Sequence, residues 1–238
     1  MKVTSNVWVV TLLAVGITAQ LTRVEGSVFA QAAQPGAPPA GAPAAGGPPP
    51  LPTFDTSKPA KLDMANATAR YRVVEQLVGL NVLSDAVGTT STVTGSIVIA
   101  PDGSIAKDSK ITVDMRTFSS DQEPRDNFIR TRTLETDKFP MLEFMPTRTK
   151  GLTLPLPSPP RIQAIGFQLI GNVTLHGVTK EVTFDVVATL RGGTVAGLAR
   201  GSLLFADFKI TKPSVPVLLS VDDKIQIEVE FRANRSAL

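Results

Sequence analysis

The side chains that most often carry catalysis or bind metals are scarce in this chain of 238 residues. It contains no Cys and a single His, which excludes disulfides, thiolate metal sites, Cys nucleophiles and most multi-histidine metal sites. His176 precedes Gly177 in a predicted turn, and the sequence nominates no second metal ligand, orienting carboxylate or nucleophile to work with it. We interpret His176 chiefly as a turn residue with a local hydrogen bond. The sequence therefore predicts neither a metal site nor a catalytic residue.

Arginines gathered in one segment are the other side chains that could recognise a ligand. Arg125, Arg130 and Arg132 lie within eight residues of each other, and guanidinium groups bind phosphate or carbonyl oxygens well. Acidic residues are interleaved with them, namely Asp121, Glu123, Asp126, Glu135 and Asp137. A solvated helix with i,i+4 ion pairs is the simpler interpretation. We keep Arg125, Arg130 and His176 as candidates for contact with a ligand head group, and a formal charge of only +3 predicts no nucleic-acid partner.

The elements that must position these residues are mainly short strands. Apolar and polar side chains alternate most strictly at Ile225, Ile227, Val229 and Phe231, which is the period of a sheet with one apolar face. Turn signals such as Pro101-Asp102-Gly103 separate the segments. We predict strands over 70–77, 92–100, 110–115, 142–145, 165–175, 179–190, 201–210 and 224–232.

One helical segment, 119–138, interrupts these strands. A Ser or Asp at 119–121 can cap the helix, Pro124 suits its first turn, and Phe139-Pro140 ends it. The Pro-rich patch 154–160 cannot lie within a ladder and is predicted to be a loop. Many short antiparallel strands with one or two short helices predict a mainly all-β, closed antiparallel barrel of about eight strands. Such a barrel is filled by its own side chains or holds one ligand.

The N-terminal part of the chain differs in composition from the rest. Behind Lys2, Val7–Ala19 is an apolar run of 13 residues, too short for the roughly 20 that span a bilayer but typical of a signal peptide. Cleavage after Ala19 or Ala30 fits the small-residue pattern, and we favour Ala30. Of the 22 residues from Gln31 to Pro52, 19 are Pro, Ala or Gly, which is typical of a disordered, extended linker. We predict a signal peptide at 1–30, a linker at 31–67, a folded domain at 68–235, and export to the periplasm or the extracellular cell envelope.

Three stretches of the domain carry recognisable motifs. In Ser109–Phe144 a strand leads into Arg125-Asp126, a Leu-x-Thr segment and a Phe-Pro-x-x-x-Phe strand entry. Gly171–Asp185 reads GNVTLHGVTKEVTFD, and Ser220–Ala233 forms a closing strand. Together they resemble the YceI-like family of polyisoprenoid-binding, periplasmic domains, and the resemblance covers most of Tyr71–Ala233. It implies a lipocalin-like barrel whose apolar channel holds an isoprenoid chain, as in a quinone or a polyprenyl phosphate.

The apolar side chains of the strands and of the helical segment are the candidates for lining this channel. A single Phe more often fills a core than binds a ligand, so the hypothesis rests on the set and on the resemblance. The predicted lining consists of Ile111, Val113, Phe118, Phe128, Ile129, Leu134, Phe139, Phe144, Phe167, Leu169, Phe184, Val186, Ile227 and Val229.

The chain also departs from the family pattern. Glu75–Thr94 lacks the His-Ser pair that the family often has near its first strand, so no role of that region is carried over. The loop at Leu152–Pro160 has the character of an insertion.

Three functions from different classes are compatible with these observations. The leading hypothesis is an exported, non-catalytic carrier of an isoprenoid lipid or quinone that uses no cofactor, with room for transient contact with a membrane surface. The alternative is an adhesion or interaction domain on a Pro-rich stalk, with a barrel filled by its own side chains. An enzyme acting on a lipid, such as an isomerase or hydrolase, is disfavoured because His176 stands alone. The sequence names neither the lipid nor the oligomeric state.

Overall fold

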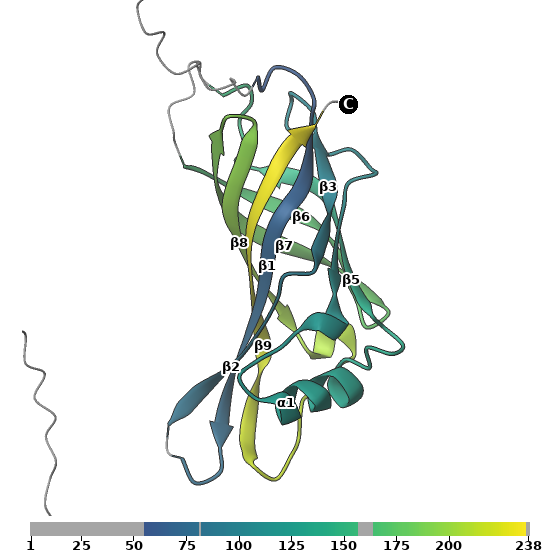
Figure 1. Cartoon of the computed structure of the whole chain (residues 1–238), viewed down its shortest axis with the longest axis vertical. Helices are drawn as coiled ribbons and strands as arrows, with labels where there is room; N and C mark the ends of the chain where they lie inside the picture. Colours follow the sequence, from purple (N-terminus) through teal and green to yellow (C-terminus); the bar gives the residue numbers. More distant parts are fainter. Residues whose placement is uncertain (1–54, 81, 157–163, 237–238) are drawn as a thin grey trace, which may run out of the picture. The chain divides into compact units, whose positions relative to one another are not determined.

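The computed structural model describes residues 55–80, 82–156 and 164–236 (Figure 1). The predicted signal peptide at 1–30, and the predicted linker up to residue 54, lie outside the described residues. So does part of the predicted Pro-rich loop, at residues 157–163. Among the described residues no helix is long and apolar enough to cross a membrane.

Nine antiparallel strands make up most of the described chain. They are β1 (Ala60–Leu77), β2 (Leu83–Thr90), β3 (Val93–Ile99), β4 (Lys110–Asp114), β5 (Met141–Lys150), β6 (Ile165–Leu175), β7 (Val178–Arg191), β8 (Thr194–Leu204) and β9 (Leu218–Ser236). Neighbouring strands pair in the order β1-β3-β4-β5-β6-β7-β8-β9, and β9 pairs back with β1. This closes an eight-stranded barrel and leaves β2 paired with β1 outside it. The predicted all-β antiparallel barrel of about eight strands is confirmed.

Alternation of apolar side chains is the reason these segments form a barrel. Along β7, Val182, Phe184, Val186 and Ala188 are buried while the residues between them are exposed. A two-residue period places one set of side chains inside the closed sheet and the other in solvent. The same inward-facing set includes Val173 on β6, which is 1% exposed.

The single α-helix of the described residues and a few irregular turns lie at one end of the barrel (Figure 1). Helix α1 (Glu123–Phe128) has Pro124 in its first turn and continues as a π-helical turn at Ile129–Thr133. Gln122 occupies the N-cap position without a side-chain bond, so a cap from 119–121 is not formed. Instead the backbone N–H of Ser120 donates to the carboxylate of Asp126. Short 3-10 helices follow β4 at Met115–Thr117 and β8 at Ala206–Phe208.

Three strand predictions are corrected by the structure. β1 begins at Ala60, so residues 60–67 are part of the sheet and not of the linker. Their Ala and Asn residues have low strand propensity, but pairing with β3 and β9 overrides it. β2 was not predicted, because its inward positions carry only small side chains, at Ala86, Gly88 and Thr90. The strand expected over 201–210 is β8, which ends at Leu204.

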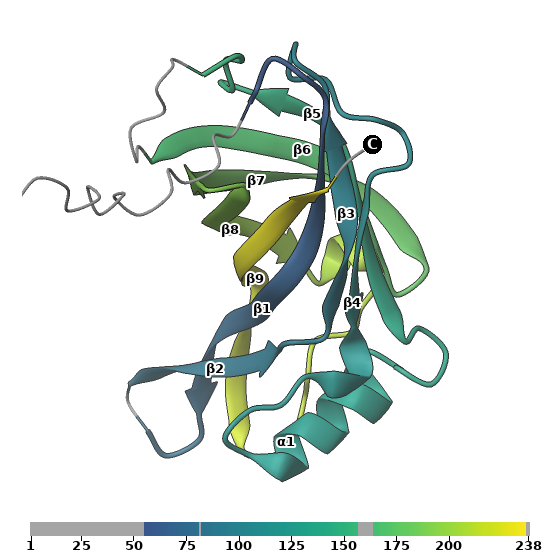
Figure 2. The ribbon, with the colours of Figure 1, turned by 45° about the horizontal axis from the view of Figure 1, so that its top comes forward.

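β1 connects the barrel to an extension at the end where α1 lies (Figure 2). One edge of β1 pairs with β9 from Lys61 to Leu77. The other edge pairs with β3 only over Ala60–Asp63 and with β2 over Ala69–Gln76. The register between β1 and β9 shifts between Val73 and Glu75, and such a bulge bends and twists the strands that contain it. β1, β2 and the start of β9 therefore continue past the barrel beside α1.

Candidate ligand-binding site

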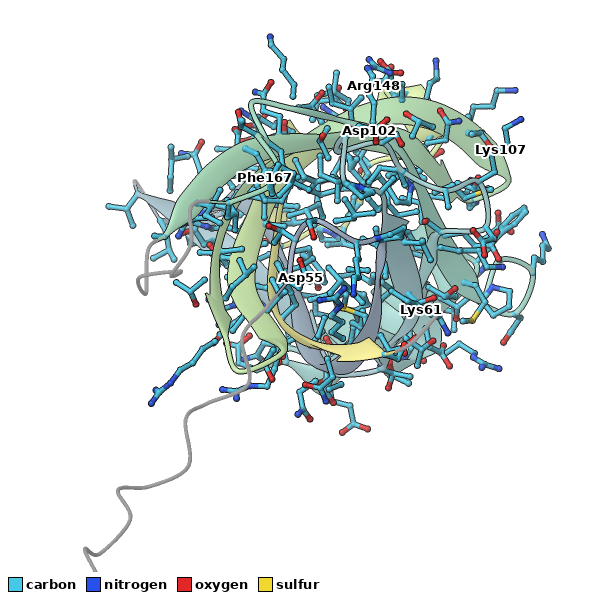
Figure 3. The ribbon with its side chains drawn as sticks, turned by 90° about the horizontal axis from the view of Figure 1, so that it is seen from above. Asp55, Lys61, Asp102, Lys107, Arg148 and Phe167 are labelled. Carbon is cyan, nitrogen blue, oxygen red and sulfur yellow. The ribbon has the colours of Figure 1, made fainter. Side chains whose placement is uncertain are left out.

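The barrel and its extension enclose one cavity of about 980 Å³. This volume lies near the upper end of the range of about 300–1,000 Å³ that is typical of small-molecule pockets. All nine strands and α1 contribute to its wall. Figure 3 looks into the barrel from the end at which β1 begins, near Lys61 and Phe167.

The composition of the wall changes along the cavity. Its apolar half lies within the barrel and is lined by residues such as Leu62, Met64, Ile97, Phe167 and Phe231. Its polar end lies where β1, β2 and α1 meet and is defined by four residues, Tyr71, Glu75, Ser84 and Arg125. An amphipathic ligand therefore has one favourable orientation in this cavity, because a polar group can be hydrogen-bonded at one end only.

Most of the predicted lining residues contribute to this wall. Phe139 is the exception, and its predicted position in the channel is corrected below. The residues that line the cavity as expected are Ile111, Val113, Phe118, Phe128, Ile129, Leu134, Phe144, Phe167, Leu169, Phe184, Val186, Ile227 and Val229. That these side chains contact a ligand remains a prediction.

Aromatic rings shape the middle of the cavity. Phe144 on β5 and Phe184 on β7 meet edge to face, with 5.1 Å between their centroids. Both rings are buried, at 8% and 9% exposed. Gly201 on β8 gives the Phe184 ring its room, since a Cβ there would lie 2.7 Å from Phe184 Cδ1. These contacts hold the wall in shape without filling the space that it encloses.

Glu75 is the most unusual side chain of the polar end. It lies on β1, faces the cavity and is only 7% exposed. Its partner is Arg125 of α1, whose Nη2 lies 3.7 Å from Glu75 Oε1. Arg125 also donates a 2.9 Å hydrogen bond from Nη1 to Asp121 Oδ1. Arg125 thus lines the cavity, as a head-group candidate should, but it is shared between two carboxylates.

Tyr71 extends the polar end toward the barrel. Its ring packs on Phe118 with 5.5 Å between centroids and covers Gly88 of β2, where a Cβ would lie 2.6 Å from Tyr71 Cζ. Burial, followed by the negative charge of Asp126, raises the pKa of the Tyr71 phenol to about 12. The phenol is therefore a neutral hydrogen-bonding group at every physiological pH.

The other two head-group candidates and Phe139 lie away from the cavity. Arg130 donates from Nη1 to the carbonyl oxygen of Phe118 at 3.1 Å. His176 and Gly177 have φ of 50° and 72° and form the two-residue turn between β6 and β7. A turn with both central residues at positive φ suits a tight hairpin. Neither Arg130 nor His176 is among the residues that line the cavity, so the structure gives no support to their expected head-group roles.

His176 instead fastens this hairpin to the segment after α1. Its Nε2 lies 3.1 Å from Glu135 Oε2, and its ring packs on Phe139 with 4.5 Å between centroids. Phe139 is held outside the cavity by this contact. The hydrogen bond from Lys138, and then that from His176, lower the pKa of Glu135. The interpretation of His176 as a turn residue is confirmed, whereas its hydrogen bond is not local, because Glu135 lies 41 residues away in the chain.

A cluster of exposed apolar side chains lies beyond the polar end, and we call it the apolar tip. It combines the β1–β2 turn with the start of β9, and the N–H of Val78 donates to the carbonyl of Val217 at 2.9 Å. Three of its residues also line the cavity, namely Val78, Leu80 and Val217. The apolar tip consists of Val78, Leu80, Val82, Leu83, Val217 and Leu219, which are 48–68% exposed.

Within the described part of the chain no group of three or more His, Asp or Glu side chains is placed to hold a metal ion.

Comparison with known proteins identifies the family. Residues 61–233 match the model of the YceI-like domain. The chain belongs to the YceI-like family. A UPF0312 protein of Yersinia enterocolitica is 29% identical over 142 residues, which are 53% of this chain and 68% of that protein.

Solved structures agree with the fold of this YceI-like domain. One is a polyisoprenoid-binding domain from Saccharophagus degradans implicated in plant cell wall breakdown, with a TM-score of 0.52 and 11% identity. The match covers 74% of this chain and 98% of the Saccharophagus degradans domain. Another is BcnA of Burkholderia cenocepacia, with a TM-score of 0.52 and 15% identity over 71% of this chain and 96% of its own. At these identities the likeness shows a shared fold.

Of the four residues that define the polar end of this YceI-like domain, sequence reasoning nominated Arg125 and missed Tyr71, Glu75 and Ser84. Glu75 and Ser84 fall in the region that departs from the family pattern, so no role was expected for them. A signal was present in the alternation of Tyr71, Val73 and Glu75, which places all three on one face of a strand. Because Val73 is apolar, that face is the buried one. A carboxylate on a buried face, as at Glu75, indicates a candidate functional residue.

Proposed function

We propose that this chain is an exported, non-catalytic binding protein that holds an amphipathic isoprenoid lipid of the quinone or polyprenyl phosphate type. The observation that carries this proposal is a mainly apolar cavity of about 980 Å³ inside the barrel. At about 25 cal/mol per Å², burying a few hundred Å² of isoprenoid chain contributes several kcal/mol. Burial of apolar surface can therefore hold an isoprenoid chain in the cavity with few directional contacts.

Two further observations support the proposal. The Saccharophagus degradans domain that shares this fold is a polyisoprenoid-binding domain. The change from an apolar half to a polar end also matches the form of a ligand with a long apolar chain and one polar group. A barrel filled by its own side chains, as the adhesion alternative expects, would leave no such volume.

The proposal is tested by asking what the purified chain carries. We expect native mass spectrometry to detect an isoprenoid lipid, and the delipidated protein to take up a quinone or a polyprenyl phosphate saturably. Ala188→Trp should block uptake, because Ala188 is 3% exposed and lines the cavity. Val187→Trp is the matched control, since Val187 points outward and is 53% exposed. Absence of both copurified lipid and uptake would contradict the proposal, as would normal uptake by folded Ala188→Trp.

We further propose that the apolar tip contacts a membrane surface when the ligand is exchanged. Neither 77–83 nor 213–219 contains a charged residue, and large exposed apolar patches on soluble domains commonly mark interaction sites. Val78, Leu80 and Val217 belong to both the tip and the cavity wall, so the apolar surface of the tip continues into the cavity beside the polar end.

Flotation with phosphatidylcholine vesicles tests the role of the tip. Replacing Leu83 and Val217 by Ser should lower the vesicle-bound fraction several-fold, because both side chains are exposed and apolar. Binding should change little between low and high salt, since the tip carries no charge. Met145→Ser, at an exposed position on β5, is the control and should bind as the unmodified chain does. Equal vesicle binding by the tip variant and the control would contradict the proposal that the apolar tip contacts a membrane surface.

A further inference from the structure

The polar end of the cavity carries specific information about the ligand's head group. We propose that it binds a neutral head group that both donates and accepts hydrogen bonds, such as the hydroxyl of a polyprenol or a quinol, and that it disfavours phosphate. This inference rests on the proposed function and, of the two lipid types that it names, disfavours the polyprenyl phosphate.

Glu75 supplies the first argument. It is 7% exposed, and Arg125 at 3.7 Å is its polar partner among the described residues. That distance exceeds a hydrogen bond, so both carboxylate oxygens are left free to accept one. The Glu75 side chain is mostly covered, and a ligand hydroxyl that donates to its carboxylate would supply a hydrogen bond that no described residue gives.

Ser84 and Thr133 supply the second argument. Ser84 lies opposite Glu75 in the β1–β2 ladder, so the two side chains lie on the same face and within reach of one group. The Ser84 hydroxyl is buried and has no hydrogen-bond partner among the described residues. The Thr133 hydroxyl is likewise buried, unpartnered and part of the cavity wall. These hydroxyls can donate to the oxygen of an incoming head group.

The balance of charge supplies the third argument, against phosphate. Five charged residues line the cavity, and two of them, Arg70 and Asp85, are exposed and paired elsewhere on the sheet, with Glu228 and Arg72. Of the remaining three, Arg125 alone is cationic, and it is already shared by Glu75 and Asp121. A phosphate placed here would bring further negative charge beside the buried Glu75 carboxylate. A neutral hydroxyl can donate to Glu75 and accept from Arg125 or Ser84 with no such repulsion.

The decisive experiment compares two ligands with the same chain and different head groups. Geranylgeraniol and geranylgeranyl phosphate, which share one isoprenoid chain, are titrated into the delipidated full-length protein, and the two affinities are measured by calorimetry. We expect the alcohol to bind about tenfold more tightly than the phosphate, the size of one charge-assisted hydrogen bond. Glu75→Gln should reduce that ratio to about threefold or less by raising the affinity for the phosphate, because it removes the repelling charge and keeps the shape.

Two control variants distinguish effects on binding of the head group from effects on binding of the isoprenoid chain. Phe167→Ala, in the apolar half, should weaken both ligands by the same factor and leave their ratio unchanged. Ser84→Ala should weaken binding of the alcohol several-fold, because it removes a buried hydroxyl that can donate to the head group, and it provides a second test if Glu75→Gln does not fold. Equal or tighter binding of the phosphate by the unmodified chain would overturn the inference while leaving the proposed function intact. Failure of the folded protein to bind either ligand, or a quinone titrated beside them, would overturn the proposed function itself.

Discussion

The apolar half and the polar end of the cavity are built in different ways. The apolar half is enclosed by a closed ring of eight strands, in which every strand has a neighbour on each side. The polar end is enclosed by β2, α1 and the start of β9, outside that ring. The first region gains its stability from side chains that pack on one another, as Phe144 does on Phe184. The second keeps buried polar groups with incomplete partners, and this is typical of a site that a ligand completes.

The largest expected difference between the two regions is in stability. Phe144→Ala should lower the free energy of unfolding by about 3–5 kcal/mol, because it empties a buried position within the ring of strands. Phe128→Ala, on α1, should cost roughly half as much or less, because Phe128 is half-buried and the surrounding segment can adjust. Urea unfolding followed by circular dichroism measures both. Equal costs would show that α1 belongs to the same cooperative core as the barrel.

A smaller difference is expected from two glycines in strands. Gly88→Ala should destabilise by about 1–3 kcal/mol, because its Cβ would displace the Tyr71 ring that packs there. Gly166→Ala on β6 is the matched control, since no atom lies within 4 Å of the added Cβ. Replacing Gly by Ala in a strand normally stabilises by roughly 0.5–1 kcal/mol, so the control should be neutral or more stable. Thermal melts of the two variants should shift in opposite directions, and a shared direction would contradict the close packing of Tyr71 on β2.

The ionisation of Tyr71 can be followed by absorbance and reports on the polar end alone. Tyr71 is the only Tyr in the chain, so the rise in absorbance at tyrosinate wavelengths reports that residue without overlap. We expect a midpoint near pH 12, because burial and then the charge of Asp126 raise the pKa of the phenol. A pKa that is higher in the folded state stabilises the fold below the unfolded value of about 10, and this contribution is lost as pH rises through about 12. A midpoint near 10 in the folded protein would place Tyr71 in solvent.

The smallest effect on stability is expected at the apolar tip. Leu83→Ser should change the free energy of unfolding by less than about 0.5 kcal/mol, because the side chain is 68% exposed. Urea unfolding should therefore be indistinguishable from that of the unmodified chain, even where vesicle binding is reduced. A large loss of stability would show that the tip packs against the polar end.

The barrel was predictable from sequence, whereas its extension was not. Strict alternation in segments such as Thr179–Leu190 predicted the strands and their inward faces, because burial on one face of a sheet imposes that period. β2 escaped detection because its inward residues are small, to make room for Tyr71. The start of β1 escaped because Ala60–Ala67 has weak strand propensity and depends on pairing with distant strands.

The candidate site shows the same division. The apolar lining followed from periodicity, which is a local property of the sequence. The pairing of Glu75 with Arg125 joins residues fifty positions apart on two elements, and no local pattern encodes that contact. Phe139 was placed wrongly for the same reason, since its contact with His176 depends on how the β6–β7 turn folds over the segment after α1.

The change of partner along one edge of β1, from β3 at Ala60–Asp63 to β2 at Ala69–Gln76, divides the described domain into two zones of hydrogen exchange. On the barrel side of this change each strand is hydrogen-bonded to two neighbours, and its amides are expected to exchange only when the ring opens. On the other side, β2 and the start of β9 flank β1 as outer strands of a three-stranded ribbon, whose amides can open locally. Under the proposed function, exchange of the ligand is therefore expected to need opening of the ribbon alone, at a rate that is independent of the unfolding rate of the barrel.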